Sequence, residues 1–523
     1  MTVRWRRGRV VALVGACVFA ASAVVAVPVL RDLAGGLAFT GVAQDVAVTP
    51  DGLAELGVTA SSEADLSGVS VFVDGEPVPV RRSGNRLVLT DTDLNDGTHT
   101  LTARRARWLL PDDEVTRTIT VDGTPPRLTV DETAVTDLRA RFTLKGRAVG
   151  ATAVTVDHRP ADLDDDGTFA VSMPSVPTTV HVVARDEAGN NSAREHAVAV
   201  RHPGMRAVHM SALGWSSRAL REPVLAMAAD GRIDTVQLDI KDEAGEIGYR
   251  SRIPLARRIG ATRDHYDAKA VVDQLHAAGI RVVGRLVAFR DPILAQASWR
   301  AGEKNRVLQT TGGQPWSGSY GEYAFTNFAD PEVVDYNVAL AEEAAELGFD
   351  DILYDYVRRP EGALSRMRIP GLRGTPEQAI VAFLAKTRAA VRGHGTFLGA
   401  SVFGIAAQRP TAIAQDIPAM AKHVDYVSPM VYPSHWGPGE YGVAHPEKQP
   451  YDITARSVAA FVRQVRGTDA QVIPWLQAFS LAHPYGTAEV VAQVRAAAKA
   501  GASSFLLWDP ACRYTPAAPP PRG

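Results

Sequence analysis

One segment of the chain joins an apolar strand to a group of residues that can do acid–base chemistry. Residues 350–360 read Asp-Asp-Ile-Leu-Tyr-Asp-Tyr-Val-Arg-Arg-Pro, so Asp355 follows an apolar run and two arginines come soon after it. A carboxyl group at the end of a buried strand can be held half-buried, and burial raises the pKa of such a group. The segment therefore makes Asp355 the leading candidate for a general acid or a nucleophile, provided that it ends a strand of a parallel barrel.

The elements that would position Asp355 are strands that alternate with helices after Pro203. Helical runs such as 268–278, 331–347, 376–392 and 488–500 separate the strands, and the helix at Pro331 should begin with Asp330 as its N-cap. This order predicts a (β/α)₈ barrel over residues 204–515; the alternative, a doubly wound sheet, lacks a glycine-rich loop after its first strand. The expected strands are Ala207–Ser211, Thr235–Ile240, Val282–Ala288, Ile352–Tyr356, Phe397–Phe403, Tyr426–Tyr432, Val472–Gln477 and Ser504–Trp508.

Functional groups of such a barrel stand where its strands end, so the polar residues at these positions are candidates for the site. Hydrolysis of a glycosidic bond usually needs two carboxyl groups, one of them protonated. Asp239 or Asp242 would be the partner of Asp355, although each could instead pair with Lys241 or with an arginine. Carboxylates and amides bind sugar hydroxyl groups, and aromatic rings stack on sugar faces. The candidate substrate-binding residues are Arg285, Arg358, Tyr432, His435, Trp436, Gln477, Trp508 and Asp509.

Each of these residues also has a structural interpretation. Asp355 could be a structural acid that pairs with Arg285 or Arg358 across the mouth of the barrel. These two arginines would either hold carboxylates or an acidic sugar, or form ion pairs inside the barrel. His435 would more often be a hydrogen-bonded structural group than a general base. Asp509, which precedes a proline, could simply end its strand.

Five motifs in this region resemble one family of glycoside hydrolase barrels that has been catalogued as a domain of unknown function. The motifs are Gln237–Asp242, Gly284–Pro292, Leu347–Pro360, Ser428–Trp436 and Pro474–Gln477. The resemblance implies a barrel that acts on carbohydrate, or that descends from enzymes that do.

The chain departs from the pattern of this family at two positions. Ser401 stands where the family tends to have Asp on the fifth strand, and Arg359 stands where it usually has Phe. Without the aspartate of the fifth strand, a barrel that binds carbohydrate without cleaving it is an alternative to an enzyme.

Before the barrel, residues 43–122 and 125–201 show period-two alternation and Asp-Gly turns with no helical stretch. This pattern predicts two β-sandwiches, and both resemble the immunoglobulin-like modules found beside exported bacterial enzymes. The expected fold class is therefore multidomain, with two all-β modules followed by a TIM-type barrel.

Residues 1–35 have the composition of an export segment. Four arginines precede an uncharged apolar run over residues 10–30, which is long enough either for an uncleaved membrane anchor or for a cleaved signal. Both interpretations place the body of the protein outside the cytoplasm, secreted or anchored to the membrane.

Composition limits the other functions of the 523-residue chain. A net charge of −2 gives no support for nucleic-acid binding, and Cys17 and Cys512 give no disulfide framework. No cluster has metal-ligand spacing, and neither a metal nor a cofactor is expected. The sequence therefore predicts a glycosidase that acts on an extracellular or cell-envelope polysaccharide. The alternatives are a non-catalytic carbohydrate-binding barrel and a structural envelope protein.

Overall fold

The computed structural model describes residues 36–41, 43–60, 66–90, 93–107, 111–132, 134–515 and 517–519. The predicted export segment at residues 1–35 lies outside these residues. Within the described part of the chain, no helix is long and apolar enough to cross a membrane. The chain divides into two compact units, the larger of which contains the barrel.

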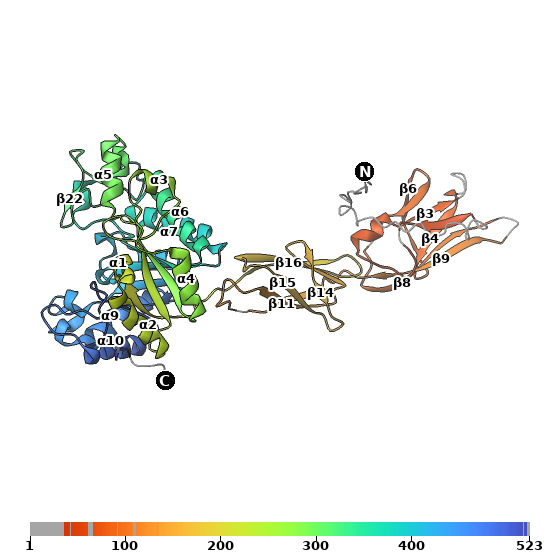
Figure 1. The fold of residues 1–523 in the computed structure, drawn as a ribbon. Coiled ribbons are helices and arrows are strands. Elements are labelled where there is room, and N and C mark those ends of the chain that lie inside the picture. Colours follow the sequence, from red (N-terminus) through yellow and green to blue (C-terminus); the bar gives the residue numbers. More distant parts are fainter. Residues whose placement is uncertain are drawn as a thin grey trace, which may run out of the picture. The chain divides into compact units, whose positions relative to one another are not determined.

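The first β region consists of two sheets that share one core (Figure 1). Leu37 and Val58 come from the first sheet and Leu101 and Ile119 from the second, and all four are buried together. The sheets have the orders β1 (Leu37–Thr40), β3 (Gly57–Ala60), β7 (Arg86–Leu89), β6 (Val80–Ser83), and β2 (Ala47–Val48), β9 (Asp113–Val121), β8 (Gly97–Arg105), β4 (Val69–Val73), β5 (Glu76–Val78).

The second β region has two four-stranded antiparallel sheets. Along β11, Phe142, Leu144 and Ala148 are buried and alternate with more exposed residues, as expected of a strand with one face on a core. The orders are β10 (Arg127–Val130), β11 (Phe142–Val149), β15 (Thr168–Met173), β14 (Asp162–Leu163), and β13 (Arg159–Pro160), β12 (Ala153–Val156), β16 (Thr179–Arg185), β17 (Asn191–Ala197). The predicted antiparallel β modules are confirmed, and their exact boundaries stay predictions.

The rest of the chain forms a closed barrel of eight parallel strand positions, which confirms the predicted fold. Pairing of β18 with β30 and of β26 with β27 closes the sheet. Pro474 has no N–H to donate and interrupts the seventh position between β28 and β29. The strands are β18 (Arg206–Met210), β19 (Thr235–Lys241), β20 (Arg281–Val287), β24 (Asp351–Asp355), β26 (Phe397–Phe403), β27 (Tyr426–Met430), β28 (Gln471–Val472) with β29 (Trp475–Gln477), and β30 (Phe505–Trp508).

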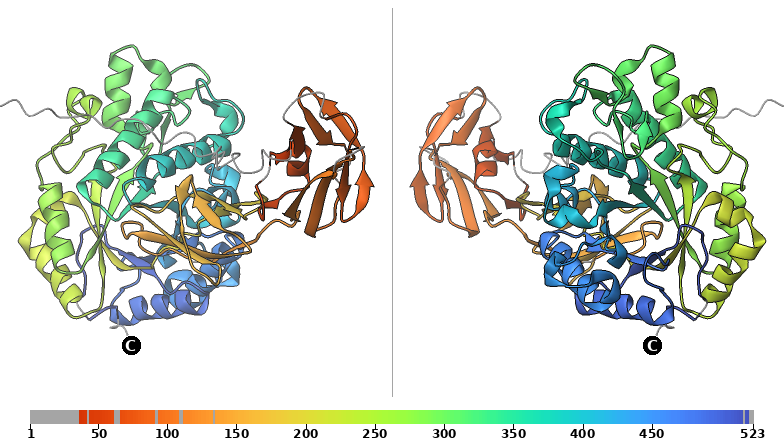
Figure 2. Two further views of the ribbon diagram at one scale, coloured as in Figure 1. Left: turned by 90° about the vertical axis from the view of Figure 1, so that its right-hand side faces the viewer. Right: turned by 90° about the vertical axis from the view of Figure 1, so that its left-hand side faces the viewer.

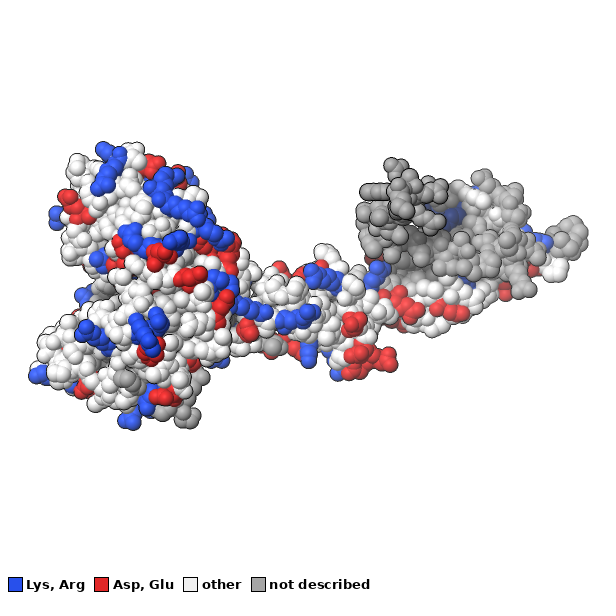
Figure 3. Space-filling view, in the orientation of Figure 1, with Lys and Arg blue, Asp and Glu red and all other residues white. Residues whose placement is uncertain are grey.

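Helices surround these strands (Figures 1 and 2). The helix at Pro331 begins as predicted, because the Asp330 side chain accepts hydrogen bonds from the first backbone N–H groups. The longer helices are α2 (Arg218–Ala229), α4 (Ala268–Ala277), α5 (Pro292–Arg300), α6 (Pro331–Leu347), α7 (Pro376–Arg392), α9 (Pro450–Gln464) and α10 (Thr487–Lys499). On the face drawn in Figure 3, Lys and Arg are interspersed with Asp and Glu over the barrel.

Side chains that point into the barrel form layers. An apolar layer that includes Val283, Leu353 and Leu506 fills the middle. A side chain at Gly399 would place its Cβ 2.3 Å from the ring of Tyr426, so only glycine leaves room for that ring. Because the interior is filled, polar groups that face inward near the C-terminal strand ends can meet a ligand only at the mouth.

Candidate active site

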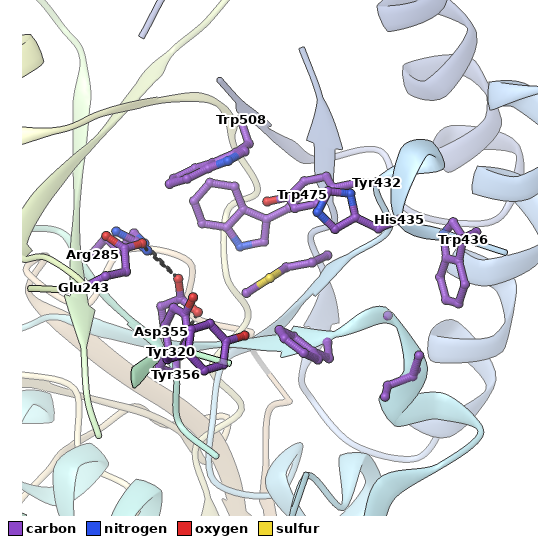
Figure 4. A pocket seen from close by; sticks show the side chains of 14 residues that line it. Glu243, Arg285, Tyr320, Asp355, Tyr356, Tyr432, His435, Trp436, Trp475 and Trp508 are labelled. Carbon is purple, nitrogen blue, oxygen red and sulfur yellow. Dashed lines mark hydrogen bonds and ion pairs between the residues drawn. The ribbon is translucent and has the colours of Figure 1, made fainter. Parts of the chain in front are cut away.

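A cavity of about 390 Å³ opens at the C-terminal ends of the strands (Figure 4). Its volume falls within the range of about 300–1,000 Å³ that is usual for small-molecule sites. Its wall combines two carboxyl groups and an arginine with many aromatic rings. The lining residues are Glu243, Arg285, Tyr320, Asp355, Tyr356, Phe403, Gly404, Ile405, Met430, Tyr432, His435, Trp436, Trp475 and Trp508.

The guanidinium group of Arg285 holds three carboxyl groups together. Arg285 is 1% exposed, and its Nε and Nη2 donate to Oδ2 of Asp355 at 3.0 and 2.6 Å. Nη1 donates to Oδ1 of Asp239 at 3.0 Å, and Nη2 also donates to Oε1 of Glu243. Bonds of this charge-assisted kind are short and strong, so the arginine fixes where all three carboxyl groups point. Because every nitrogen is engaged, this arginine is not free to bind an acidic sugar.

His209 is the second cation of this cluster. Its Nε2 lies 3.1 Å from Oδ1 of Asp239, and its ring lies over Trp508 with centroids 4.0 Å apart. Burial alone would lower the pKa of His209, but the carboxylate of Asp239 outweighs it and raises the pKa to about 9. The histidine is therefore charged at neutral pH.

The charges of the cluster keep two of its carboxyl groups ionised. Burial would raise the pKa of Asp239, but His209 and Arg285 together lower it. Burial would also raise the pKa of Glu243, and Arg285 again lowers it. A group held as an anion cannot donate a proton, so Asp239, which is 3% exposed, fits an electrostatic role better than that of a general acid.

A β-bulge separates Asp239 from Lys241. The register between β19 and β20 shifts after Asp239, which turns Lys241 toward the helices. There its Nζ donates to Asp291 at 2.8 Å and to Asn337 at 2.9 Å. The ion pair between Lys241 and Asp239 or Asp242 that the sequence left open is therefore absent from the described contacts.

The backbone turns sharply directly after Asp355. Tyr356 has a φ of 47°, in the left-handed region that residues other than glycine rarely adopt. This turn lets the backbone N–H of Tyr356 donate to Oδ1 of Asp355 at 2.7 Å. Both carboxyl oxygens of Asp355 are thus bound, one by the backbone and one by Arg285. Unusual backbone of this kind is concentrated at functional sites.

Arg358 lies behind the wall of the cavity and does not line it. It is 1% exposed, and its guanidinium carbon lies 4.0 Å from the ring centre of Phe403 and 4.9 Å from that of Tyr356. Its Nη2 donates to the hydroxyl of Tyr320 at 3.1 Å. The arginine therefore positions three aromatic rings that face the cavity.

The opposite wall is also held by buried polar contacts. The indole N–H of Trp475 donates to Oγ of Ser401 at 2.9 Å. The side chain of Gln477 accepts from the backbone of Ser434 at 3.0 Å and donates to the backbone of Phe479 at 3.0 Å. Gln477 is fully buried and thus orients the loop that carries His435, rather than contacting the cavity itself.

The predicted site residues thus fall into two groups. Tyr432, His435, Trp436 and Trp508 line the cavity beside Asp355. Burial lowers the pKa of His435, which favours its neutral form. Asp509 lies outside the cavity, where its Oδ1 accepts from the backbone N–H of Ala511 at 2.7 Å and shapes the turn after β30.

Asp242 lies at the edge of the site, in a turn after β19. Its Oδ1 accepts from the backbone N–H groups of Ala244 and Glu246 at 3.0 and 2.9 Å. Burial, helped by the negative charges of Asp239 and Glu243, raises the pKa of Asp242 to about 6. Among the acids of the mouth, this group is suited to hold a proton and to release it.

Sequence reasoning missed several residues of the site. Glu243 directly follows the motif Gln237–Asp242, but nothing local distinguishes it from Asp242. His209 could have been found, because two-residue alternation from Ala207 points it inward. Tyr320 lies in the turn between β22 (Ser317–Gly318) and β23 (Gly321–Glu322), in a segment without any periodic pattern. Within the described residues, no group of three His, Cys, Asp or Glu is placed to hold a metal ion.

A closed parallel barrel with ionisable and aromatic residues at its mouth defines the class of TIM-type barrel proteins. Residues 207–514 match the family described as "putative glycosyl hydrolase domain", and the chain belongs to this family. No curated protein matches the chain.

Three solved structures are among those that resemble the chain. A hypothetical protein from Ruminiclostridium thermocellum is 29% identical over 37% of this chain and 96% of its own, with a TM-score of 0.33. The glycoside hydrolase domain of PgaB (BpsB) from Bordetella bronchiseptica is 18% identical over 59% and 95%, with a TM-score of 0.45. Ega3 from Aspergillus fumigatus, solved in complex with galactosamine, is 10% identical over 58% and 91%, with a TM-score of 0.33.

Proposed function

We propose that the protein is a glycoside hydrolase that cleaves a polysaccharide outside the cytoplasm by carboxyl-group catalysis. One observation carries the proposal: Asp355 and Glu243 share Arg285 and face a cavity that is lined mainly by aromatic side chains. Rings of this kind stack on the apolar faces of sugars, and carboxylates accept hydrogen bonds from hydroxyl groups.

The charge of the cluster suits a reaction that develops positive charge. Three carboxyl groups, those of Asp239, Glu243 and Asp355, face two cations, Arg285 and His209, so the ionised cluster has an excess negative charge. Cleavage of a glycosidic bond passes through a transition state that resembles an oxocarbenium ion. Fixed negative charge in a site that largely excludes water stabilises such a cation without reorganisation.

The proposed roles follow from position and proton affinity. Asp355, fixed by Arg285 and by its own turn, would face the anomeric carbon as nucleophile or as the base for a water molecule. Asp242 would give its proton to the glycosidic oxygen as the C–O bond breaks. Water then supplies a hydroxyl group to the anomeric carbon, and its remaining proton returns to a carboxylate, so that the two products account for every atom.

The location of the substrate is inferred from the start of the chain. Four arginines followed by an apolar run, in residues 1–35, support export of the protein. A polysaccharide of the cell envelope or of the surrounding medium is therefore the substrate class that we propose.

One observation favours a second candidate, a barrel that binds carbohydrate without cleaving it. Ser401, which stands where the family tends to have Asp, follows Ala400, the register partner of Tyr354 on β24, and its Oγ accepts a hydrogen bond from Trp475. The two candidates differ in turnover but share the aromatic cavity.

The test is release of reducing ends from a panel of purified bacterial envelope polysaccharides by the full-length protein. We expect release by the wild type and a loss of at least about a hundredfold in Asp355→Asn, the size typical of a lost acid or base. The matched control is Asp273→Asn on α4, which removes only an exposed pair with Lys269. Equal activity of wild type and Asp355→Asn would remove Asp355 from the mechanism, and tight binding without any release would select the second candidate.

A further inference from the structure

A second cavity of about 380 Å³ lies at the ends of β18 and β19, where its lining includes Asp239, the acceptor of a hydrogen bond from Arg285. Glu243 and Trp508 line both cavities, so they stand between the two. Arg290 links the two sides as well, because it lines the second cavity while its guanidinium group lies over the ring of Tyr356 at 5.0 Å. The second cavity is lined by His209, Ser211, Ala212, Leu213, Asp239, Asp242, Glu243, Glu246, Gly248, His265, Arg290, Trp508 and Pro510.

The two cavities differ in chemistry. The first has seven residues with aromatic side chains of Phe, Tyr or Trp type in its wall, whereas the second has Trp508 alone among those types. In their place the second cavity has four carboxyl groups against the cationic groups of His209 and Arg290. Both described hydrogen bonds to the carboxyl group of Asp242 go to Oδ1, which leaves Oδ2 able to receive a donor from a ligand. The wall therefore suits a ligand that is rich in hydroxyl groups.

We infer that the second cavity is a binding subsite for the next sugar residue of the same glycan chain, and that this sugar carries hydroxyl groups and no carboxyl group. A glycan that lies across Glu243 and Trp508 would place one sugar in each cavity. The glycosidic bond that joins these two sugars would then lie beside Glu243. A uronic acid would place its negative charge among the carboxyl groups of the second cavity, which opposes binding.

Which of the two cavities holds the leaving group rests on the proposed function. If Asp242 protonates the glycosidic oxygen, the sugar that it faces in the second cavity belongs to the leaving group. The existence of the subsite does not depend on cleavage, because a barrel that only binds glycans would use the same two cavities.

The experiment measures affinity as a function of glycan length. The probe is an array of neutral and uronic-acid-containing oligosaccharides of one to six sugar residues from bacterial envelope polysaccharides. The full-length Asp355→Asn variant, which is expected not to consume the probe, serves as the parent. We expect at least a tenfold gain in affinity when a neutral glycan becomes long enough to enter the second cavity, and a smaller gain when the added sugar is a uronic acid.

Two changes address the lining of the second cavity. Ala212→Leu, added to the parent, fills part of the cavity, and Asp242→Asn removes the carboxylate while it preserves the size of the side chain. Both should abolish the length-dependent gain. Ala212→Leu should also leave the affinity for the shorter glycan unchanged, and Asp273→Asn should keep the gain. Thermal melting of each variant checks that it is folded.

The outcomes separate the two proposals. A gain that persists in folded Ala212→Leu and Asp242→Asn would overturn the subsite, even if the wild type cleaves polysaccharide. A gain that disappears in both variants would support the subsite, even if the wild type cleaves nothing and the proposed function is wrong. Failure of the wild type and the parent to bind any glycan of the array would overturn both.

Discussion

Replacement of Arg285 by methionine should destabilise the barrel strongly. The guanidinium group is 1% exposed and donates to Asp239, Glu243 and Asp355, so its removal leaves buried carboxyl groups that lack their main cation. Loss of one partner from a buried ion pair costs about 3–5 kcal/mol. At about 2.1 cal/mol/K of unfolding entropy per residue, over roughly 310 residues, this corresponds to a decrease in Tm of about 5–8 °C.

The assay is differential scanning calorimetry of the full-length protein, followed through the transition of the barrel. Arg285→Lys should lose less stability than Arg285→Met, because lysine keeps the positive charge. It should still be less stable than the wild type, because lysine cannot donate in three fixed directions. The matched control is Arg218→Met, which removes only an exposed pair with Glu222 and should cost less than about 1 kcal/mol.

The dependence on pH distinguishes lost charge from lost packing. Arg285 and His209 lower the pKa of Asp239, so the stability that this carboxylate contributes is present above its unfolded pKa and is lost as pH falls through the folded one. The difference between wild type and Arg285→Met should therefore be full at pH 7 and smaller at about pH 3, where the unfolded chain takes up protons that Asp239 of the folded wild type does not. A loss of less than about 1 kcal/mol at pH 7, or an equal loss at both values, would refute the electrostatic explanation.

Three further changes test other parts of the structure. The stability that His209 contributes should be full below pH 6.5 and lost as pH rises through about 9, so urea titrations should show this decline in wild type and a flat profile in His209→Gln. If Asp242 is the general acid, the hydrolysis rate should fall as pH rises through about 6, and Asp242→Asn should lack this limb and be about 10²–10⁴-fold slower. A pH–rate profile that Asp242→Asn leaves unchanged would contradict this role. Gly399→Ala should lower the free energy of unfolding in urea by at least about 1–3 kcal/mol, because its Cβ meets the ring of Tyr426. The control Gly393→Ala, which has open space around it, should change this free energy little. Equal stabilities of the two variants would show that the ring moves aside.

The architecture of the barrel was predictable because strands and helices depend on short-range patterns. Seven of the expected strands agree with those of the structure to within about two residues at each end, as is usual for such boundaries. The eighth, over 472–477, is split by Pro474, whose missing N–H could have been read from the sequence. The helix at Pro331 begins at its predicted N-cap for the same local reason.

The chemistry of the strand ends was predictable only in part. Parallel strands end on the same side of a barrel, so the sequence could predict that four residues meet at one mouth: Asp355, Tyr432, Trp436 and Trp508. The sequence left open whether Asp355 would pair with Arg285 or with Arg358 and which other acids Arg285 would hold, because its long side chain can reach acids of two other strands. Only distances in the folded barrel select Asp239, Glu243 and Asp355 from the many carboxyl groups nearby.

The sequence by itself determined that this chain builds β modules before a parallel barrel, since alternating apolar patterns decide which residues can be buried. The tertiary structure decided which of the strand-end residues share a cavity. A β-bulge turned Lys241 away from Asp239, and Arg358 was placed behind the aromatic wall instead of in front of it. Such choices depend on bulges, loop paths and closure of the barrel, which join residues far apart in the chain, and no local pattern encodes them.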